Sequence, residues 1–462
     1  MTDGPTLTLA RFVAEAAVPA DVRQVTRRYV LDWLGSTLAG GELRPPSIAR
    51  AVVEELGGRP EATVLATGER TSAPLAAFAN AAAAHVLEMD DLDRESISHP
   101  AAPIVAVALA EGERVGADGA ALLDAIAVGY EVGIRVGEAL GPSHYEHFHT
   151  TGTAGTLGAA AAAARLAGLD VDGVHRALGS AGTMAAGLWE FLTDGAMSKQ
   201  LHPAKAAHDG ILAARLAAHG FTAATRILEG PKGLLAGMSA EPRVERLTDG
   251  LDAHMRDWRI SGVSFKVHAS CRHTHSAVDA ALLLRAREAL RPEAIARVDV
   301  RLYRQALGLL EGMEPTTPYA AKFSLPFCLA VALAHGDLAP QRFTDASITE
   351  PATLALAARV TFTTDPELDA LYPRAWPSVV TVTTTDGAVH TARVDHPAGD
   401  PESGIGDDEI TAKFITLTAT RFDGGAAGVA RAILSDEPPP GASALAALAT
   451  GHARVGAAVA GA

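Results

Sequence analysis

The pattern of apolar residues changes near residue 260, and this change constrains the fold more than any other feature of the chain. From Leu7 to about Leu251, apolar residues recur at helical spacing in Ala-rich segments with Gly at their ends. Three later segments are rich in β-branched residues: 296–303, 358–364 and 379–385. Asp386-Gly387, which follows the last of these, is typical of a hairpin turn into 389–394. The sequence therefore predicts a helical part and a part that contains a sheet.

Helical patterns also occur between and after these strands, at 275–289, 326–335 and 407–418. We therefore expect a mainly α fold with an inserted α+β domain. The large helical bundle domain is discontinuous and comprises residues 1–265 and 398–462. The smaller α+β lid domain comprises residues 266–397.

Prolines interrupt the helical pattern at several places. Pro203 and Pro231 are interpreted as turns. Pro438-Pro439-Pro440 begins an Ala/Gly-rich tail, which is interpreted as a peripheral helix or a disordered segment.

The charge balance excludes several classes of partner. The 462 residues carry a formal net charge of −15, and no run of Lys or Arg is long enough to bind a nucleic-acid backbone. No apolar run reaches membrane-spanning length, the N-terminus lacks a signal-peptide pattern, and the two cysteines, Cys271 and Cys328, fit a reducing compartment. We expect a cytoplasmic protein with no nucleic-acid or membrane partner.

An acidic protein that binds an anion must gather its cations locally, so clusters of Lys, Arg and His are informative.

The first polar cluster follows His85 and contains four acidic residues: Glu88, Asp90, Asp91 and Asp93. Such a density indicates either a polar pocket or, more commonly for charged runs, a solvent-exposed turn. His99 stands directly before Pro100, which holds the preceding residue extended and directs its side chain. His99 is therefore a candidate functional residue.

The second cluster, residues 144–152, joins three histidines to the start of a long Ala/Gly helix. Thr150 or Thr151 can cap that helix, and the free N–H groups at its N-terminus form a seat for a carboxylate. His149, at the mouth of such a seat, can move a proton. A zinc site would need a further ligand at suitable spacing, and the GxxGxxG spacing of the following glycines fits close helix packing better than a nucleotide loop.

Two further clusters hold cations. Lys199 follows a Gly-containing turn and precedes His202, a place from which it can point into a cleft. Residues 264–275 hold Lys266, Arg272 and three histidines at the predicted junction of the two domains, where ligands commonly bind. So many cations together are costly without an anion, which favours a functional site, although Cys271 by itself is more typical of a small buried apolar residue.

At these residues the sequence resembles the MmgE/PrpD family, which includes 2-methylcitrate dehydratase, cis-aconitate decarboxylase and iminodisuccinate epimerase. The resemblance extends over about residues 7–414. Beside the four clusters, it rests on further motifs in the same order and spacing: Leu31-Asp32-Trp33-Leu34-Gly35, Ala77-Phe78-Ala79-Asn80, Ala321-Lys322-Phe323-Ser324-Leu325, Tyr372-Pro373, Asp386-Gly387 and Lys413-Phe414. It implies a helical domain made from both ends of the chain, an inserted α+β lid and a homodimer. It also implies an active site between the domains, lined by His99, His149, Lys199 and Lys266.

Four positions depart from the pattern of the decarboxylase branch. Glu88 stands in place of Asp, Leu92 in place of Thr, Cys271 in place of a catalytic His, and Phe327 in place of Tyr. These departures predict a chemistry other than cis-aconitate decarboxylation.

We therefore expect a cofactor-independent lyase of the dehydratase type that removes the α-proton of a small di- or tricarboxylic acid, without a metal. An epimerase of a dicarboxylic acid such as iminodisuccinate and a non-catalytic helical scaffold remain as alternatives. Carbon acids beside a carboxylate are weak, so a base must be combined with cations that stabilise the enolate. The candidate catalytic residues are His99, His149, Lys199, Lys266 and Cys271. The candidate substrate-binding residues are Glu88, Asp91, Tyr145, His202, Arg272 and His275.

Overall fold

The computed structural model describes residues 4–251, 255, 257–422, 424–435 and 437–451, and the chain forms two compact units. The first unit comprises Met1–Val86, Asp90–Val263 and Gly406–Ala462. The second comprises Leu87–Met89 and Ser264–Ile405. Helices dominate the chain and strands are few, so the prediction of a mainly α fold with a small α+β part is confirmed.

The first unit is a helical bundle. Its α-helices are α1 (Pro5–Glu15), α2 (Ala20–Gly40), α3 (Arg44–Leu56), α4 (Ala73–His85), α5 (Ala101–Val115), α6 (Gly119–Tyr145), α7 (Thr150–Leu166), α8 (Val171–Met184), α9 (Phe191–Asp194), α10 (Leu201–Ala218), α11 (Leu234–Met238), α18 (Asp407–Leu417), α19 (Ala426–Leu434) and α20 (Ala442–Thr450). A short 3-10 helix, η1 (Met197–Gln200), leads into α10. Two short strands, β1 (Ala62–Thr63) and β2 (Arg70–Thr71), pair antiparallel within this unit, and the sequence pattern had not indicated them.

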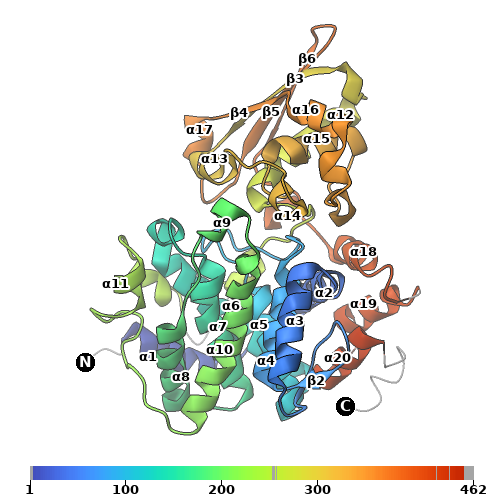
Figure 1. Ribbon diagram of the computed structural model, residues 1–462. Coiled ribbons are helices and arrows are strands. Elements are labelled where there is room, and N and C mark those ends of the chain that lie inside the picture. The colour runs from blue at the N-terminus through green and yellow to red at the C-terminus, as the bar shows by residue number, and fades with distance from the viewer. Residues whose placement is uncertain (1–3, 252–254, 256, 423, 436, 452–462) are drawn as a thin grey trace. The chain divides into compact units, whose positions relative to one another are not determined.

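Small residues let the central helices approach closely. Helix α7 packs against both α6 and α10, and α4 and α5 lie alongside them (Figure 1). A Cβ atom added at Gly158 of α7 would come within 2.7 Å of the Gly129 carbonyl oxygen in α6. Likewise, a Cβ atom added at Gly210 of α10 would come within 2.5 Å of the Ala159 Cβ atom. The glycine spacing in α7 therefore serves helix packing, as the sequence predicted.

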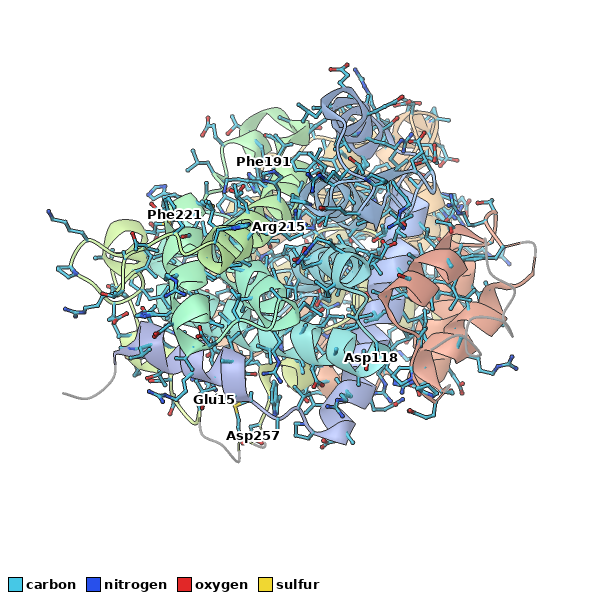
Figure 2. The ribbon with its side chains drawn as sticks, turned by 90° about the horizontal axis from the view of Figure 1, so that it is seen from below. Glu15, Asp118, Phe191, Arg215, Phe221 and Asp257 are labelled. Atoms are coloured by element: carbon cyan, nitrogen blue, oxygen red, sulfur yellow. The ribbon has the colours of Figure 1, made fainter. Side chains whose placement is uncertain are left out.

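Polar side chains fix the ends and the flanks of these helices, and two of them are labelled in Figure 2. Asp118 precedes α6 and accepts a hydrogen bond from the Ala121 N–H at 2.8 Å, which caps the helix. Arg215 of α10 forms ion pairs with Glu61 at 2.8 Å and with Glu111 at 3.2 Å.

The first unit is completed by helices from the end of the chain. Helices α18 and α19 pack against α2. The Lys413 ammonium donates to the buried carboxylate of Asp32 at 2.6 Å, and the Phe414 ring lies against Gly35. Specific contacts between α2 and α18 thus join distant parts of the sequence within the first unit.

The second unit contains a four-stranded sheet in the order β4-β3-β5-β6. Its strands are β3 (Ile295–Leu302), β4 (Val360–Thr364), β5 (Ser378–Thr384) and β6 (Val389–Val394). Strand β3 is parallel to β4 and antiparallel to β5, and its Val300 stands opposite Phe362 on one side and Val380 on the other. The four strands lie where β-branched residues predicted them, and the β5–β6 hairpin turns at Asp386-Gly387.

Helices accompany this sheet, and one of them, α12, packs against β5 and β6. The helices of the second unit are α12 (His275–Arg287), α13 (Arg304–Leu310), α14 (Pro318–Ala321), α15 (Leu325–His335), α16 (Pro351–Ala357) and α17 (Pro366–Asp369). A 3-10 turn, η4 (Arg272–Thr274), leads into α12.

Two local predictions were wrong, and the prediction for the C-terminal tail can be compared with the structure only as far as residue 451. Pro203 lies in the first turn of α10, where a proline needs no N–H partner, so it does not form a turn. Helix α7 begins at Thr150 with His149 as its N-cap residue, and no side chain caps it. The tail forms α20, which packs against α5, whereas residues 452–462 lie outside the described residues.

In the part of the chain that the structure describes, no helix combines the length and the apolar character needed to cross a lipid bilayer.

Candidate functional site

Four histidines from four different segments of the first unit come together. His85 ends α4, His99 lies just before α5, His149 precedes α7 at its N-cap position, and His202 lies in the first turn of α10. We call His85, His99, His149 and His202 the imidazole cluster. Their rings form a connected set, with centroid distances of 4.9 Å between His85 and His99, 5.5 Å between His85 and His149, and 5.2 Å between His149 and His202.

All members of this cluster are buried, and His85 is 0% exposed. The acidic run that follows His85 is buried as well, so the prediction of a solvent-exposed turn was wrong. The reason is that each of two carboxylates in this run has a defined partner. Asp91 accepts from the Tyr130 hydroxyl at 2.8 Å and from the Ala101 N–H at 3.0 Å. Asp93 accepts from the Ser96 N–H at 2.8 Å.

Hydrogen bonds define the protonated nitrogen of His99. Its Nδ1 atom lies 2.6 Å from the carbonyl oxygen of Asp91, and a carbonyl can only accept. The Nδ1 atom therefore carries a hydrogen, and in the neutral ring Nε2 carries none. The backbone N–H of His99 donates to the Thr151 hydroxyl at 3.0 Å, which ties this residue to the start of α7.

His149 and His202 share a hydrogen between their Nδ1 atoms, which lie 3.0 Å apart. One ring must donate and the other must accept, so the two rings have opposite tautomers. Burial lowers the pKa of His149 well below its ordinary value, and the positive charges of His202 and Lys199 lower it further. Burial likewise lowers the pKa of His202 to about 4, so both rings are neutral at pH 7.

Aromatic side chains enclose His149 and His202. The Trp189 ring lies 4.8 Å from the His149 ring, and the Phe191 ring lies 5.5 Å from the His202 ring. Tyr145, a predicted substrate-binding residue, packs edge-on against Trp189 at 4.9 Å. Trp189 is held by backbone bonds to residues 147 and 148, since its N–H donates to the His147 oxygen at 3.1 Å and its indole N–H to the Phe148 oxygen at 3.0 Å.

The predicted lysine of this site is buried. Lys199 is 2% exposed and lies in η1, and its positive charge is one of the causes that lower the pKa of His149 and of His202. A buried ammonium beside several neutral imidazoles is suited to an anion, because it offers a positive charge in surroundings of low polarity.

A second group of predicted residues lies in the second unit. The Lys266 ammonium is fully buried and donates to the Glu88 carboxylate at 2.9 Å, and the Tyr319 hydroxyl donates to the other Glu88 oxygen at 3.0 Å. Glu88 has a φ of 57°, a left-handed conformation that is uncommon outside glycine. Lys322 holds the same short segment, because it donates to the Leu87 carbonyl at 2.8 Å.

Arg272 and His275 form a separate network in the second unit. The Arg272 guanidinium pairs with the buried carboxylate of Asp400 and donates to the Phe265 and Ala398 carbonyls at 3.2 and 3.1 Å. His275 Nδ1 lies 2.9 Å from the same guanidinium, so it accepts, and burial lowers the pKa of His275 well below its ordinary value. These contacts favour a structural role for Arg272, whereas substrate binding by it stays a prediction.

The predicted cysteine, Cys271, precedes η4 and is buried, with its N–H donating to the Lys322 carbonyl at 2.9 Å. The structure thus brings His99, His149 and His202 together in the first unit, and Glu88 and Lys266 together in the second. That all of these residues line one crevice between domains stays a prediction.

Sequence reasoning missed several residues of these networks. His85 and Asp90 were part of the first polar cluster but were not chosen. Tyr319 and Lys322 also escaped selection, although Lys322 belongs to one of the family-like motifs. The available signal was the density of polar residues in otherwise Ala-rich surroundings, since buried polar groups usually have partners.

Two groups of side chains in the described residues have donor atoms close enough to hold a metal ion. One is His85, Asp90 and His99, and the other is His396, Asp400 and Glu402. In the second group Asp400 already pairs with Arg272, which leaves little negative charge for a cation. The three histidines of residues 144–149 do not form such a group, because His144 bonds to the Met238 carbonyl and the Thr153 hydroxyl, and His147 is exposed.

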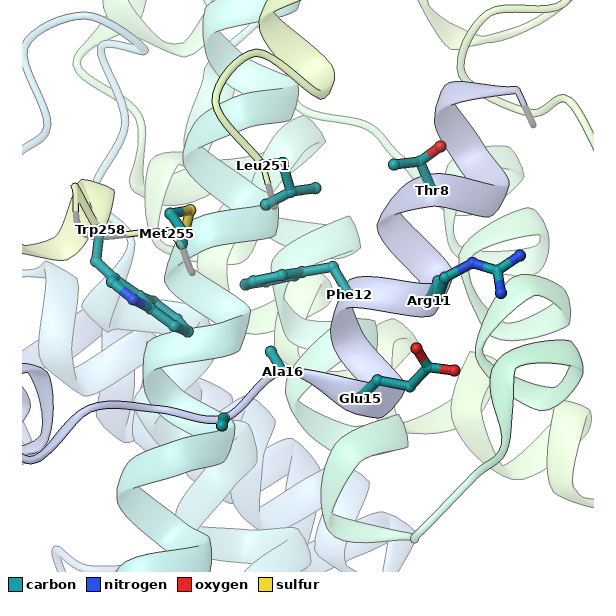
Figure 3. Close-up of a pocket in the computed structure, with 9 residues that line it drawn as sticks. Thr8, Arg11, Phe12, Glu15, Ala16, Leu251, Met255 and Trp258 are labelled. Atoms are coloured by element: carbon teal, nitrogen blue, oxygen red, sulfur yellow. The ribbon is translucent and has the colours of Figure 1, made fainter. Parts of the chain in front are cut away.

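A surface pocket of about 350 Å³ lies elsewhere on the first unit, between α1 and the side chains of Leu251, Met255 and Trp258 (Figure 3). Phe12 and Trp258 line it with their rings 5.5 Å apart, and Arg11 and Glu15 supply its charges. It contains no residue of the imidazole cluster, so we do not select it as the functional site.

Fold and site together describe a mainly α protein whose larger unit encloses a cluster of four buried, neighbouring histidines. A model of the MmgE/PrpD N-terminal domain matches residues 7–247, and a model of the MmgE/PrpD C-terminal domain matches residues 268–435. The chain belongs to the MmgE/PrpD family.

Individual relatives agree with this assignment. Cis-aconitate decarboxylase from Aspergillus terreus is 26% identical over 435 residues, which cover 88% of this chain and 87% of the relative. Cis-aconitate decarboxylase-like protein oryM from Aspergillus oryzae (strain ATCC 42149 / RIB 40) is 26% identical over 431 residues, which cover 88% of each chain. These matches support an enzyme.

Proposed function

We propose that this protein is a cofactor-independent lyase that removes the proton next to a carboxylate in a small di- or tricarboxylic acid. The observation that carries the proposal is the imidazole cluster beside the buried Lys199. Membership of the family supports it, as does the likeness to a decarboxylase of cis-aconitate, a tricarboxylic acid.

His149 is the proposed base. A general base must be unprotonated at the working pH, and burial keeps His149 neutral. If Nε2 takes the substrate proton, Nδ1 carries the hydrogen that His149 donates to His202 Nδ1, 3.0 Å away. His202 then stabilises the imidazolium that forms, because it accepts this hydrogen bond in surroundings that hold little water.

Lys199 is the proposed partner of the substrate carboxylate. Removing a proton beside a carboxylate creates an enolate with additional negative charge, and a buried ammonium stabilises that charge more strongly than it would in water. A bound carboxylate would also favour the protonated form of His149, which raises its strength as a base when the substrate is present.

His99 is the proposed acid. Its Nδ1 hydrogen is committed to the Asp91 carbonyl, so its Nε2 is the atom that delivers a proton to a departing hydroxyl in a dehydration. The departures from the decarboxylase pattern at Glu88, Leu92 and Cys271 favour such a reaction over decarboxylation of cis-aconitate.

An epimerase is the second candidate, because several imidazoles in one cluster offer more than one group that can return a proton to carbon. The two reactions differ in their products. New ultraviolet absorbance from a conjugated alkene identifies a dehydratase, whereas a change in optical rotation without absorbance identifies an epimerase.

The test is exchange of the α-hydrogen for deuterium. Citrate, 2-methylcitrate, cis-aconitate and iminodisuccinate are each incubated with the enzyme in deuterium oxide and followed by NMR. We expect at least one acid to exchange or react, and we expect His149→Gln to abolish this. His147→Gln removes an exposed imidazole two residues away and serves as the matched control.

Full exchange in folded His149→Gln would remove His149 from the mechanism. A thermal-shift screen with the same acids separates an enzyme from a scaffold, since a scaffold gains no stability from them.

A further inference from the structure

One carboxylate lies between two rings of the imidazole cluster. The Asp90 Oδ2 atom is 2.6 Å from His85 Nδ1 and 3.4 Å from His99 Nδ1. The side chains of Asp90 and His85 are both 0% exposed. The other two rings, His149 and His202, have no such carboxylate contact among the described residues and have Lys199 as a charged neighbour.

His85 has one nitrogen engaged and one available. A hydrogen on Nδ1 lets it donate to Asp90, and this leaves Nε2 with a lone pair. Among the described residues, Nε2 has no hydrogen-bond partner, although it is buried. A buried nitrogen without a partner costs free energy and calls for an explanation. The His85 ring contacts the rings of both His99 and His149, so it links these two members of the cluster.

A metal ion held by His85, Asp90 and His99 is one explanation, but the hydrogen bonds disfavour it. His99 Nδ1 carries a hydrogen for the Asp91 carbonyl and cannot ligate a metal. The 2.6 Å between His85 Nδ1 and Asp90 is also short for two ligands of one zinc ion, which lie about 3.3 Å apart when each bond is about 2.0 Å long. The distances fit a shared hydrogen better than a shared metal.

We propose that Asp90 and His85 are positioning residues that divide the imidazole cluster into an acid side and a base side. Asp90 supplies the negative charge that an additional proton on His99 requires, and His85 holds Asp90 in place through its Nδ1 hydrogen. His99 is then the proton-bearing acid and His149, without a carboxylate, is the neutral base. The inference rests on the proposed function and adds Asp90 and His85 as the residues that position the acid.

The surroundings of Asp90 support this division. Asp91 and Asp32 also lie near it, and burial raises the pKa of both carboxyls, with the negative charge of Asp90 as a further cause. Asp32 has its own cation in Lys413, and Asp91 has Tyr130 and Ala101 as donors. Of these three carboxylates, Asp90 is the one that contacts the rings of the cluster.

The test compares Asp90→Asn with His85→Asn. The first removes the charge but keeps the shape. The second keeps a group that can donate to Asp90 but removes Nε2. Glu131→Gln is the control, because Glu131 is an equally buried carboxylate of the same unit whose partners are Arg135 and Arg259. Each variant is checked for folding by circular dichroism before its kinetics are measured.

With the acid found to react, we expect Asp90→Asn to lower kcat by at least about 100-fold, in the range of general acid catalysis, while KM changes less than about threefold. His85→Asn, whose amide still donates to Asp90, should lower kcat much less than Asp90→Asn does. In ¹⁵N-histidine NMR, a strongly downfield ring N–H signal should disappear in both variants and persist in Glu131→Gln.

A folded Asp90→Asn enzyme with unchanged kcat, or with a loss confined to KM, would overturn the proposal. The NMR signal needs no substrate, so its absence from the parent protein refutes the His85–Asp90 pair whatever the reaction is. If the signal is present and none of the acids reacts, the proposed function fails while the pair stands.

Discussion

Asp93 is a carboxylate whose burial should cost the protein measurable stability. Its side chain is buried near Glu138, and burial, followed by the negative charge of Glu138, raises the pKa of Asp93 from 3.8 to about 6. The hydrogen bond from the Ser96 N–H acts in the opposite direction but does not cancel these causes. Asp93 is therefore more easily protonated in the folded than in the unfolded chain.

The magnitude follows from the two pKa values. Each pKa unit corresponds to about 1.36 kcal/mol, so a difference of about 2 corresponds to about 3 kcal/mol. Because the folded-state pKa is the higher one, stability from this group is fully present below pH 4 and is lost as the pH rises through about 6. At pH 7 the folded protein carries the whole cost of a buried charge.

Asp93→Asn should remove this cost. The amide oxygen of Asn can still accept from the Ser96 N–H, while the charge is gone. We expect the variant to be more stable than the parent by up to about 3 kcal/mol at pH 7, and to be of similar stability near pH 4. Urea unfolding of both proteins at several pH values between 4 and 8 measures the difference.

The control is Asp118→Asn, which changes an exposed carboxylate at the N-cap of α6, where Asn also caps well. It should alter stability little at any of these pH values. A constant difference between Asp93→Asn and the parent from pH 4 to pH 8, or a destabilised variant at pH 7, would refute the reasoning.

Three further predictions concern other parts of the structure. His202→Leu should lower kcat by about 10- to 100-fold in steady-state assays. His202→Asn should retain more activity, because its side-chain oxygen can replace Nδ1 as the hydrogen-bond acceptor. An equal loss of activity in both variants would exclude the acceptor role of His202. Arg272→Met leaves the carboxylate of Asp400 buried without its cation, so it should destabilise the second unit by about 3–5 kcal/mol in urea unfolding. An effect on KM alone would instead favour a role of Arg272 in substrate binding. Gly158→Ala should lower the melting temperature by several degrees, because its Cβ atom would meet a backbone oxygen at 2.7 Å, whereas Gly237→Ala in open space should not.

Much of the fold could be predicted from the sequence because its signals are local. The hairpin of β5 and β6 follows from two β-branched runs around Asp386-Gly387, and α12 follows from helical spacing that begins at His275. Helix α7 and its glycine face were likewise evident in the Ala/Gly pattern. The two-stranded pairing of β1 and β2 was not, because strands of two residues carry too little periodicity.

The partners within the candidate site could be predicted less well, because they come from distant segments. The anion that compensates Arg272 is Asp400, 128 residues further along the chain, so a cluster of cations in the sequence did not show that it was already neutralised. The acidic run after His85 had the composition of an exposed turn, and only the packing of α6 and α7 around it shows why it is buried.

The contact between α2 and α18 has a consequence for how the protein is made. Lys413 lies 381 residues after Asp32, and the sequence of the entire second unit lies between them. During synthesis on the ribosome, the Asp32 carboxylate therefore cannot pair with the Lys413 ammonium until α18 has emerged. Helix α2 can pack early against α4, α5 and α6, but its contact with α18 forms late, so a chain truncated before α18 should leave one face of α2 exposed.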